Sequence, residues 1–371
     1  MERTSILVTN SGVNIFTGGG LVSFNILEAL LSLSKVKLVL SNQHFQDSKY
    51  GDIPAYCIDP SQYGYQDPFF YDYMASSILP EEPIDLACFY ACPFNKTAEK
   101  LQKENFTKIV SDLAPHNIQL SAEEHIKWSG KYPYPHLTND FLRGLYLKHL
   151  RLSDKVIVHS HSSAEYIKGA AGLKELPTVI PHGCYLPEES DIQSHPSEFR
   201  AGYFGSLGLD KGVIYLLSAW LESEMCKTHK LWFGGAGTEN LQQTFGLTDE
   251  SMKSIMIIGA VKNSASFYNS ISVYVQPSIQ DGFGITPLEA MANKRPVIVS
   301  EGAGVSELVT DGKDGFRVPM RSPGALKEKL QYFIDNPSEI TRMGAEAYKT
   351  ASRYTWDNIK KQYNEVFKEL L

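Results

Sequence analysis

Short apolar runs alternate with helix-like segments along almost the whole chain, and this alternation limits the fold more than any other feature. Residues 5–9 (Ser-Ile-Leu-Val-Thr) and 36–40 (Val-Lys-Leu-Val-Leu) are typical of buried strands, while residues 21–33 between them place leucines at helical spacing. Strands separated by helices form βαβ units, so the sequence predicts an α/β fold with mainly parallel sheets. Further strands are expected at residues 84–90, 108–111, 156–159, 200–205, 230–233, 255–258, 273–276 and 297–300, and further helices at 213–222 and 287–293.

The length of the chain predicts two domains. It has 371 residues, and single cores rarely grow beyond about 300 residues. The least patterned stretch, residues 181–196, contains three prolines and a glycine and is typical of a linker. We therefore expect an N-terminal domain at residues 1–180, a linker at 181–196 and a C-terminal domain at 197–353. Open α/β sheets bind ligands at the carboxyl ends of their strands, so two such domains facing each other would form a cleft.

Charge and cysteine content exclude several classes of protein. The chain has 35 Lys and Arg against 42 Asp and Glu, and the net charge of −7 argues against a nucleic-acid binder. Five scattered cysteines, an odd number, indicate free thiols in a reducing compartment. The sequence contains neither a secretory signal nor the run of roughly 18 apolar residues that a membrane-spanning helix needs. These features predict a cytoplasmic protein, with contact at a membrane surface left open.

The segment at residues 276–289 is the richest in candidate chemistry. A strand ends, a turn with two glycines follows, and a helix opens with free backbone N–H groups, which suits an anion. Asp281 lies on the turn and Glu289 lies in the helix. Two interpretations stay open: the carboxylates contact different hydroxyls of one extended polar ligand, or Asp281 caps the helix and Glu289 is solvated.

Residues 205–212 form a second candidate, because they join a strand to a helix and place Lys211 where that helix begins. A lysine beside helix N–H groups suits a diphosphate. The segment lacks the residue order of a P-loop, and the glycines at 18–20 lack the spacing of a dinucleotide-binding loop. An oxidoreductase with a dinucleotide cofactor is therefore a distant alternative.

Taken together, these segments resemble retaining glycosyltransferases of the GT-B fold, in the large group known as family 4 or group 1. Residues 281–292 resemble the family's block of two acidic residues separated by seven others, and residues 302–316 are similar to the block that follows it. Residues 205–212 resemble its Gly-Arg-Leu-x-x-x-Lys-Gly segment, and residues 179–183 (Val-Ile-Pro-His-Gly) resemble its linker. The glycines at 18–20 match its first-strand loop.

The resemblance implies two Rossmann-like domains that face a central cleft. Residues 354–356 (Tyr-Thr-Trp) are similar to the start of the family's last helix. The resemblance thus implies that residues 354–371 form a helix that crosses back to the first domain.

The resemblance also implies a nucleoside-diphosphate (NDP) sugar donor, held mainly by the C-terminal domain. Lys211 would neutralise the diphosphate, Asp281 would contact the transferred sugar and Glu289 would accept hydrogen bonds from the ribose. No metal ion and no other cofactor is implied, and the sequence contains no Asp-x-Asp motif. The remaining donor-binding positions implied by the resemblance are Gly19, Gly20, Ser206, Val261 near the base, Phe283, and the backbone of Gly284, Ile285 and Thr286 at the phosphates.

Three positions depart from the family's pattern. Ser206 stands where the family usually has Arg, so one cation at the phosphates is missing, and Asp281 stands where Glu is usual. Ser111 precedes Asp112 where many members carry a histidine beside the transferred sugar. His116 lies five residues beyond Ser111, and it either replaces that histidine as a catalytic group or is an ordinary loop residue.

Other features favour structural interpretations over functional ones. His159, His161 and His182 are expected to be packing or surface residues rather than catalysts or metal ligands. The aromatic stretch at residues 63–73 could line an acceptor site, but core packing is favoured. The basic helix expected at residues 143–155 could contact anionic lipid, but a solvated face is favoured.

The sequence thus predicts a retaining, metal-independent glycosyltransferase that moves a sugar from an NDP-sugar to an acceptor hydroxyl. The acceptor would be a glycan, a lipid-linked sugar or a small metabolite, with polysaccharide biosynthesis as one setting, and no nucleic acid is expected as a partner. The alternatives are a nucleotide-sugar epimerase of the same fold and a non-catalytic sugar-nucleotide-binding subunit. Ser206 and Ser111 favour the non-catalytic alternative.

Overall fold

The computed structural model describes residues 2–9, 13, 18–41, 50, 52–57, 68–91, 93–105, 107–113, 118–129, 140–261 and 263–371. Contacts divide the chain into two compact units. The first unit comprises Met1–Pro115, Tyr134–His182 and Trp356–Leu371, and the second comprises His116–Pro133 and Gly183–Thr355. Residues 118–129, which we expected in the first domain, therefore pack with the second unit.

The first unit contains a parallel sheet that has, within the described residues, seven strands in the order β3-β2-β1-β4-β5-β6-β7. Ile6, Leu7 and Val8 of β1 are fully buried, as expected for strands that are covered on both faces. The order reverses between β1 and β4, which is the switch point where such sheets bind ligands. The strands are β1 (Thr4–Thr9), β2 (Lys35–Ser41), β3 (Ala55–Cys57), β4 (Leu86–Tyr90), β5 (Lys108–Asp112), β6 (Lys155–Val158) and β7 (Thr178–Val179).

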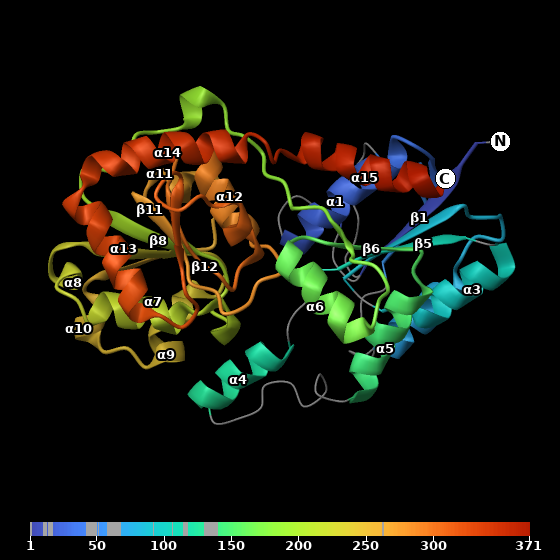
Figure 1. The fold of residues 1–371 in the computed structure, drawn as a ribbon, viewed down its shortest axis with the longest axis horizontal. Helices are drawn as coiled ribbons and strands as arrows, with labels where there is room; N and C mark the ends of the chain where they lie inside the picture. Colours follow the sequence, from blue (N-terminus) through green and yellow to red (C-terminus); the bar gives the residue numbers. More distant parts are fainter. Residues whose placement is uncertain are drawn as a thin grey trace. The chain divides into compact units, whose positions relative to one another are not determined.

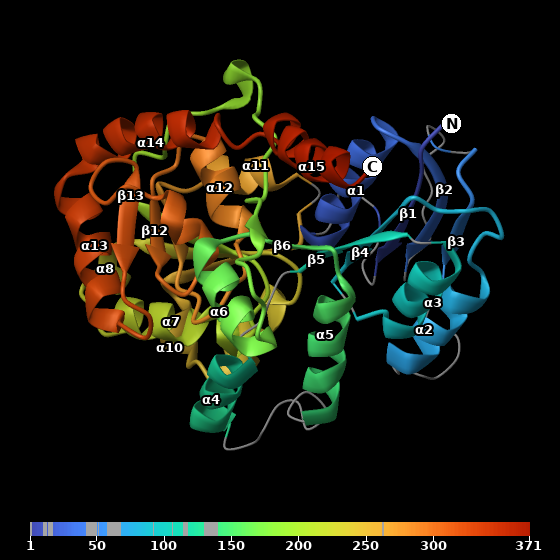
Figure 2. The same cartoon turned by 45° about the vertical axis from the view of Figure 1, so that its right-hand side comes forward.

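Helices cover both faces of this sheet. Helices α1 and α15 lie on one face, and α2, α3 and α5 lie on the other (Figures 1 and 2). The glycines at 18–20, expected as a loop before a helix, form the first turn of α1 itself. The helices are α1 (Gly18–Leu31), α2 (Pro68–Ser77), α3 (Asn95–Asn105), α5 (Asp140–Leu152), α6 (His161–Ala171) and α15 (Trp356–Leu370).

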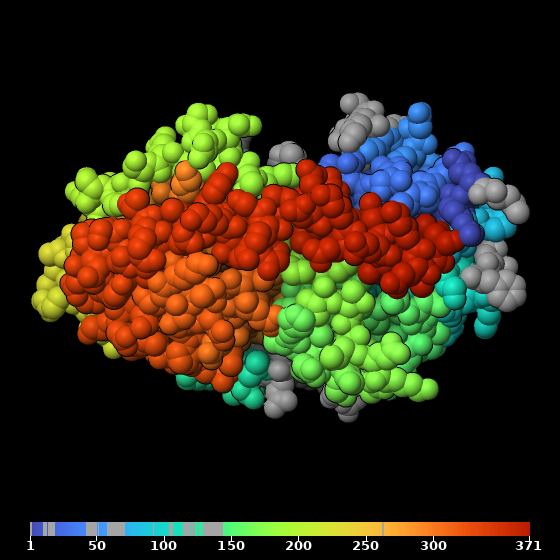
Figure 3. Space-filling model, turned by 45° about the horizontal axis from the view of Figure 1, so that its top comes forward, coloured from blue at the N-terminus to red at the C-terminus, as the bar shows by residue number. Residues whose placement is uncertain are grey.

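The C-terminal helix α15 returns to the first unit, as predicted. It packs along α1, and Asn364 Nδ2 donates to Ser32 Oγ at 3.0 Å. Figure 3 shows α15, in red, against the blue N-terminal segment. The middle of α15 is bound to the sheet, because the buried Tyr363 hydroxyl donates a hydrogen bond to Asp112 at the end of β5.

The second unit repeats the architecture with the strand order β10-β9-β8-β11-β12-β13. Helices α7 and α13 enclose a core around Trp220, Phe233 and Phe333 on one face. Helices α11, α12 and α14 enclose a second core around Tyr268 and Tyr274 on the other. The strands are β8 (Arg200–Phe204), β9 (Lys230–Gly234), β10 (Ile255–Gly259), β11 (Val273–Gln276), β12 (Val297–Ser300) and β13 (Gly315–Val318). The helices are α7 (Val213–Leu221), α8 (Met225–Thr228), α9 (Leu241–Phe245), α10 (Asp249–Met252), α11 (Ser264–Asn269), α12 (Ile285–Ala292), α13 (Pro323–Asp335) and α14 (Pro337–Ala351).

The segment that follows β7 is attached to the second unit by backbone and guanidinium hydrogen bonds. Cys184 N donates to Tyr354 O at 2.9 Å. The buried Arg295 guanidinium donates to Gln193 O at 2.8 Å and to Tyr268 O at 2.7 Å. Residues 183–196 are therefore a structured part of the second unit.

Helix α4 (Ile118–Ser129) completes the second unit, although it lies between β5 and β6 in the chain. It lies against the 3₁₀ turn η4 (Leu209–Lys211). Among the described residues, no helix combines the length and apolar character that crossing a bilayer requires.

Candidate functional site

The candidate site lies at the carboxyl edge of the second sheet, where the strand order reverses between β8 and β11. The loops that follow β8, β11 and β12 meet there through backbone hydrogen bonds. Ile279 N donates to Asp210 O at 2.8 Å, and Asp281 N donates to Gly302 O at 2.9 Å. The first bond joins the two sequence segments that we singled out, residues 205–212 and 276–289, and the second joins residues 276–289 to the loop after β12.

Gly212 allows this close approach. Its φ is +67°, and a Cβ atom at this position would lie 1.9 Å from Pro277 O. Any side chain would therefore collide with the β11 loop, and the left-handed backbone would be strained as well. The turn that holds Lys211 thus depends on glycine at position 212.

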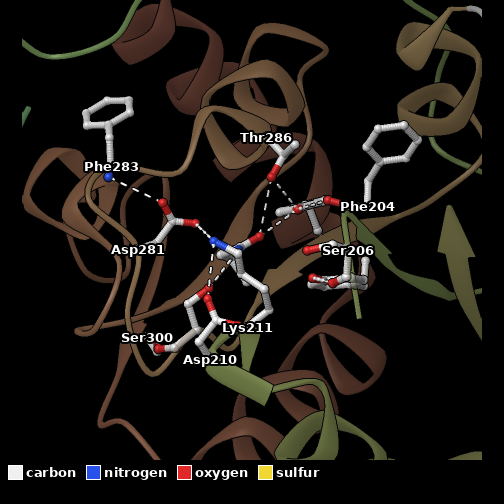
Figure 4. Close-up of polar contacts among 12 residues, drawn as sticks. Phe204, Ser206, Asp210, Lys211, Asp281, Phe283, Thr286 and Ser300 are labelled. Carbon is white, nitrogen blue, oxygen red and sulfur yellow. Dashed lines mark hydrogen bonds and ion pairs between the residues drawn. The ribbon is translucent and has the colours of Figure 1, made fainter. Parts of the chain in front are cut away.

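Lys211 and Asp281 form an ion pair at the centre of the site. The Lys211 ammonium lies 2.8 Å from Asp281 Oδ2 and 4.0 Å from Asp210 Oδ2. Figure 4 shows the ammonium pointing to the Asp281 carboxylate. Burial alone would lower the pKa of Lys211, but the two carboxylates outweigh it and the pKa is raised. Lys211 is therefore positively charged at neutral pH.

The N-terminus of α12 lies beside this pair. Its N-cap is Gly284, at φ +89°, which has no side chain to cap the first turn. The preceding turn is fixed to the β12 loop, because Gly304 N donates to Asp281 O at 3.1 Å and Val305 N donates to Phe283 O at 2.7 Å. A rigid helix N-terminus without a side-chain cap attracts negative charge.

A polar network holds the first turn of α12 to the sheet. The Tyr274 hydroxyl lies 2.7 Å from Thr286 Oγ1, 2.7 Å from Gln276 Oε1 and 3.1 Å from Phe204 O. Gln276 Nε2 in turn donates to Ser278 Oγ at 2.7 Å. The network connects β8, β11 and α12, so it fixes the helix N-terminus relative to the turn that carries Lys211.

Glu289 lies one turn further along α12 and is bound by a buried tyrosine. Tyr268 Oη donates to Glu289 Oε2 at 2.7 Å. Burial raises the pKa of Glu289 to about 6, and the hydrogen bond from Tyr268 opposes part of this shift. Within the part of the chain that the structure describes, the second carboxylate oxygen has no hydrogen-bond donor, so it can accept a further hydrogen bond.

The structure disagrees with the interpretation of Asp281 as a helix cap and Glu289 as a solvated residue. Asp281 does not cap α12 but binds Lys211, and it also accepts a long hydrogen bond from Phe283 N at 3.4 Å. Glu289 is half-buried and bound to Tyr268 rather than solvated. The contact of the two carboxylates with one shared ligand stays a prediction.

The other predicted site residues lie at different distances from this centre. Phe283 is a core residue, so it would contribute through its backbone, and Gly284, Ile285 and Thr286 lie at the α12 N-terminus. Ser206 is exposed at the end of β8, and its carbonyl accepts a hydrogen bond from Tyr203 Oη at 2.5 Å. Val261 follows β10, and Gly19 and Gly20 lie in α1 of the first unit. Their donor contacts stay predictions, and His116 lies outside the described residues.

Sequence reasoning missed several residues that build the site. Asp210 flanks Lys211 and supplies the carbonyl that binds the β11 loop. Tyr268 and Tyr274 hold Glu289 and Thr286, and their sequence context marks them only as apolar. Gln276 carried a signal, because a polar residue at the end of a buried strand indicates the edge where ligands bind.

The histidines after the first sheet's strands pack as expected. His159 Nε2 lies 3.0 Å from Asp112 Oδ1, and His159 Nδ1 lies 3.0 Å from Ile180 O. His182 is buried against His159, and burial holds its pKa well below the usual range. His161 is exposed.

The aromatic and basic stretches also have structural roles where the structure describes them. Asp72 accepts hydrogen bonds from Lys96 N at 2.7 Å and from Thr97 N at 2.9 Å, so it caps α3. Lys148 pairs with Glu99 at 2.6 Å and Lys155 pairs with Glu369 at 2.9 Å. Residues 63–67 lie outside the described residues.

Comparison with known proteins finds a family match within the second unit. Residues 198–336 match the family model described as glycosyl transferases group 1. The capsular polysaccharide biosynthesis glycosyltransferase CapM of Staphylococcus aureus is 29% identical over 179 residues, which cover 46% of this chain and 47% of CapM. The lipopolysaccharide core biosynthesis mannosyltransferase LpcC of Rhizobium leguminosarum bv. viciae is 28% identical over 221 residues, which cover 53% of this chain and 59% of LpcC. These matches span about half of the curated relatives' length.

Solved structures show the fold over nearly the whole chain. Sucrose-phosphate synthase of Thermosynechococcus elongatus has a TM-score of 0.78 at 17% identity, with 99% of both chains covered. The Anabaena protein HepE in complex with UDP has a TM-score of 0.71 at 18% identity, with 99% of this chain and 100% of HepE covered. The chain therefore has the GT-B fold, as predicted. Its residues 198–336 are similar to the glycosyl transferases group 1.

Proposed function

We propose that this chain is a retaining glycosyltransferase that moves a sugar from an NDP-sugar to an acceptor hydroxyl without a metal ion. The observation that carries the proposal is the Lys211–Asp281 pair, 2.8 Å apart, beside the N-terminus of α12. The charged ammonium and the helix N–H groups suit the diphosphate, and the carboxylate suits the hydroxyls of the sugar.

The residues of the second unit divide the donor between them. Lys211 and the backbone of Gly284, Ile285 and Thr286 would bind the phosphate oxygens, and Asp281 would accept hydrogen bonds from the transferred sugar. The free oxygen of Glu289 would accept from the ribose, while Tyr268 holds the other oxygen at 2.7 Å. The Lys211 ammonium and the N–H groups at the start of α12 would stabilise the negative charge that grows on the leaving diphosphate, which is the main electrostatic demand of the reaction.

We propose a front-face mechanism. The bond between the sugar's anomeric carbon and the diphosphate breaks, and a bond to the acceptor oxygen forms on the same face. The acceptor's proton moves to the departing phosphate oxygen, so no side chain has to act as a nucleophile. In this scheme Asp281 acts through hydrogen bonds to the sugar and through its hold on Lys211.

The relatives support the class of donor and acceptor. HepE was solved with UDP and with UDP-glucose, which supports a nucleotide-sugar donor for this chain too. CapM and LpcC are named for capsular polysaccharide and lipopolysaccharide core biosynthesis. A glycan or lipid-linked sugar of a cell-surface polysaccharide is therefore our proposed acceptor.

Donor binding should weaken as the pH falls through about 6, because the pKa of Glu289 is raised to about 6 and the free oxygen of its ionised carboxylate is the proposed acceptor for the ribose. The free energy of unfolding should change in the opposite direction to donor binding as the pH falls. A raised folded pKa favours the protonated folded state, so the contribution of Glu289 to stability increases as the pH falls from about 6 towards 4.5. Calorimetric titration of donor between pH 5 and 8 checks the first effect. Glu289→Gln should flatten the profile, and an unchanged slope in that variant would assign the pH dependence elsewhere.

Ser206→Arg should tighten donor binding. It restores the cation that the family usually places beside the diphosphate, and a hydrogen bond to a charged group stabilises by about 1.5–3 kcal/mol, or roughly tenfold or more in Kd. Ser206→Gln has similar bulk without the charge and serves as the control. Donor Kd should fall only in the arginine variant, and less at high salt. Equal affinity in both variants would show that position 206 does not face the phosphates.

The proposed function is tested by turnover with UDP-, GDP-, ADP- and dTDP-sugars in the presence of EDTA. We expect one donor to release its nucleotide slowly, faster with an acceptor, and NMR of the product to show the anomeric configuration of the donor. Consumption of the donor with a change in the sugar and no transfer would indicate the epimerase instead. Binding without turnover under every acceptor would indicate the non-catalytic subunit that Ser206 and Ser111 favour.

A further inference from the structure

We propose that helix α4 is a clamp on the turn that carries Lys211, and that Glu124 is the positioning residue that holds the clamp closed. The inference rests on the proposed function, because the turn concerned is the proposed diphosphate site. We call residues 118–129 the α4 clamp and residues 205–212 the donor turn. The clamp lies against η4, which forms the second half of the donor turn.

One face of α4 is built to dock on the second unit. Leu120, Glu124 and Trp128 recur every four residues and therefore share a face of the helix. Leu120 packs against the core that contains Tyr215. Trp128 meets the Tyr215 ring edge-on, with the centroids 5.8 Å apart. The opposite side is open to solvent, since Ile126 is 51% exposed, and Trp128 at the end of the docked face is itself 43% exposed.

Glu124 supplies the polar anchor of this face. Its carboxylate is fully buried and accepts hydrogen bonds from Tyr215 Oη at 2.7 Å, from Trp128 Nε1 at 3.1 Å and from Arg321 Nε. Arg321 follows β13, so the carboxylate is held from two separate elements of the second unit. A buried carboxylate that loses its charge partners is strongly destabilised, and the docked position of α4 therefore depends on these donors.

Tyr215, which donates to Glu124, is joined to the donor turn by a backbone hydrogen bond. Tyr215 lies in the first turn of α7, and its backbone N–H donates to Gly212 O at 2.9 Å, directly after Lys211. The Glu124–Tyr215 hydrogen bond thus holds the helix that continues the donor turn, while the body of α4 covers η4. Undocking of α4 would release both restraints on the backbone of Lys211. The clamp orders the diphosphate site before the donor arrives, which reduces the ordering that binding must supply.

The test compares Glu124→Gln and Tyr215→Phe with Glu123→Gln. Glu123 is the neighbouring exposed carboxylate and contacts the outer nitrogen of the same Arg321 guanidinium at 3.2 Å, so it is the matched control.

We would measure amide hydrogen exchange in residues 118–129 and 205–217 of the full chain, and the Kd of UDP by calorimetry. Both test variants should exchange faster in the two segments and bind UDP about three- to tenfold more weakly, as expected for one or two lost hydrogen bonds. Saturating donor should restore kcat to within about twofold, because binding itself then orders the turn. Glu123→Gln should match the wild type.

Three results would overturn the clamp. The first is a variant in which α4 exchanges faster but residues 205–217 exchange at the wild-type rate, because the helix would then not restrain the turn. The second is an unchanged exchange rate in α4 itself in both test variants, because Glu124 would then not hold the helix in place. The third is unchanged UDP affinity in a chain whose wild type binds UDP. If the wild type binds no nucleoside diphosphate, the proposed function fails, and the exchange data still decide whether α4 restrains the turn.

Discussion

Lys211→Met is expected to lower kcat/KM for the donor about 100- to 1,000-fold, as the loss of one preorganised charge-stabilising donor does in other enzymes. We expect a loss near the upper end of this range. The motif that residues 205–212 resemble has an arginine and a lysine, and this chain has Ser206 in place of the arginine but keeps Lys211. The ammonium is charged and fixed 2.8 Å from Asp281, so it needs little reorganisation when charge develops on the leaving diphosphate. The check is steady-state kinetics with the preferred NDP-sugar.

Two comparisons separate this effect from general damage. Lys253→Met removes an exposed lysine of the same unit, which pairs only locally with Glu250, and should leave kcat/KM unchanged. Asp281→Asn alone should also be strongly impaired, and the double variant should lose much less than the sum of the two single losses, because the two residues act as one pair. Kinetics of Lys211→Met within about threefold of the wild type would contradict the role of Lys211.

Gly212→Ala is expected to have the largest effect on stability of any single methyl addition at the site. The new Cβ would lie 1.9 Å from Pro277 O, and the backbone φ of +67° disfavours every residue with a side chain. Strain of the left-handed backbone alone costs about 1–2 kcal/mol. The clash must also move the donor turn away from the β11 loop. We therefore expect a loss of more than about 2 kcal/mol in the free energy of unfolding, together with loss of donor binding.

Gly246→Ala is the matched control for this prediction. Gly246 has a φ of +61°, and a Cβ atom there would have no neighbour within 4 Å, so the variant reports the backbone strain without the clash. Denaturant unfolding should show about 1–2 kcal/mol lost in Gly246→Ala, with donor affinity retained. Equal losses in the free energy of unfolding of the two variants would mean that the donor turn can move away from Pro277 O at no further cost.

Much of the fold could be predicted from the sequence, because strands covered on both faces are continuous apolar runs. The strands β11 (Val273–Gln276) and β12 (Val297–Ser300) have the expected bounds. The short strands β3 (Ala55–Cys57) and β7 (Thr178–Val179) were not predicted, since two or three residues cannot show a periodicity. β13 (Gly315–Val318) was missed because its apolar run is broken by the exposed Arg317.

The site was predictable where local motifs build it. Lys211, Asp281 and the start of α12 come from two contiguous segments, and the resemblance to a family joined them. The contacts of α4 could not be predicted, because Tyr215 and Arg321 lie 91 and 197 positions from Glu124 in the chain. An amphipathic pattern predicts that a helix packs, but it does not tell which core the helix packs on. His159 and Asp112 illustrate the same limit, since they bind each other from neighbouring strands of the sheet.

The central claim is that the second unit binds a nucleoside diphosphate at Lys211, the α12 N-terminus and Glu289. The most direct measurement is calorimetric titration of the wild type and of Glu289→Ala with UDP, GDP, ADP and dTDP at pH 7.5 in EDTA. We predict that one nucleotide binds with one site per chain and that its Kd rises at least about tenfold in Glu289→Ala, since hydrogen bonds to a charged group stabilise by about 1.5–3 kcal/mol. Heat changes no larger than dilution for all four nucleotides, or equal affinity in the two proteins, would contradict the account.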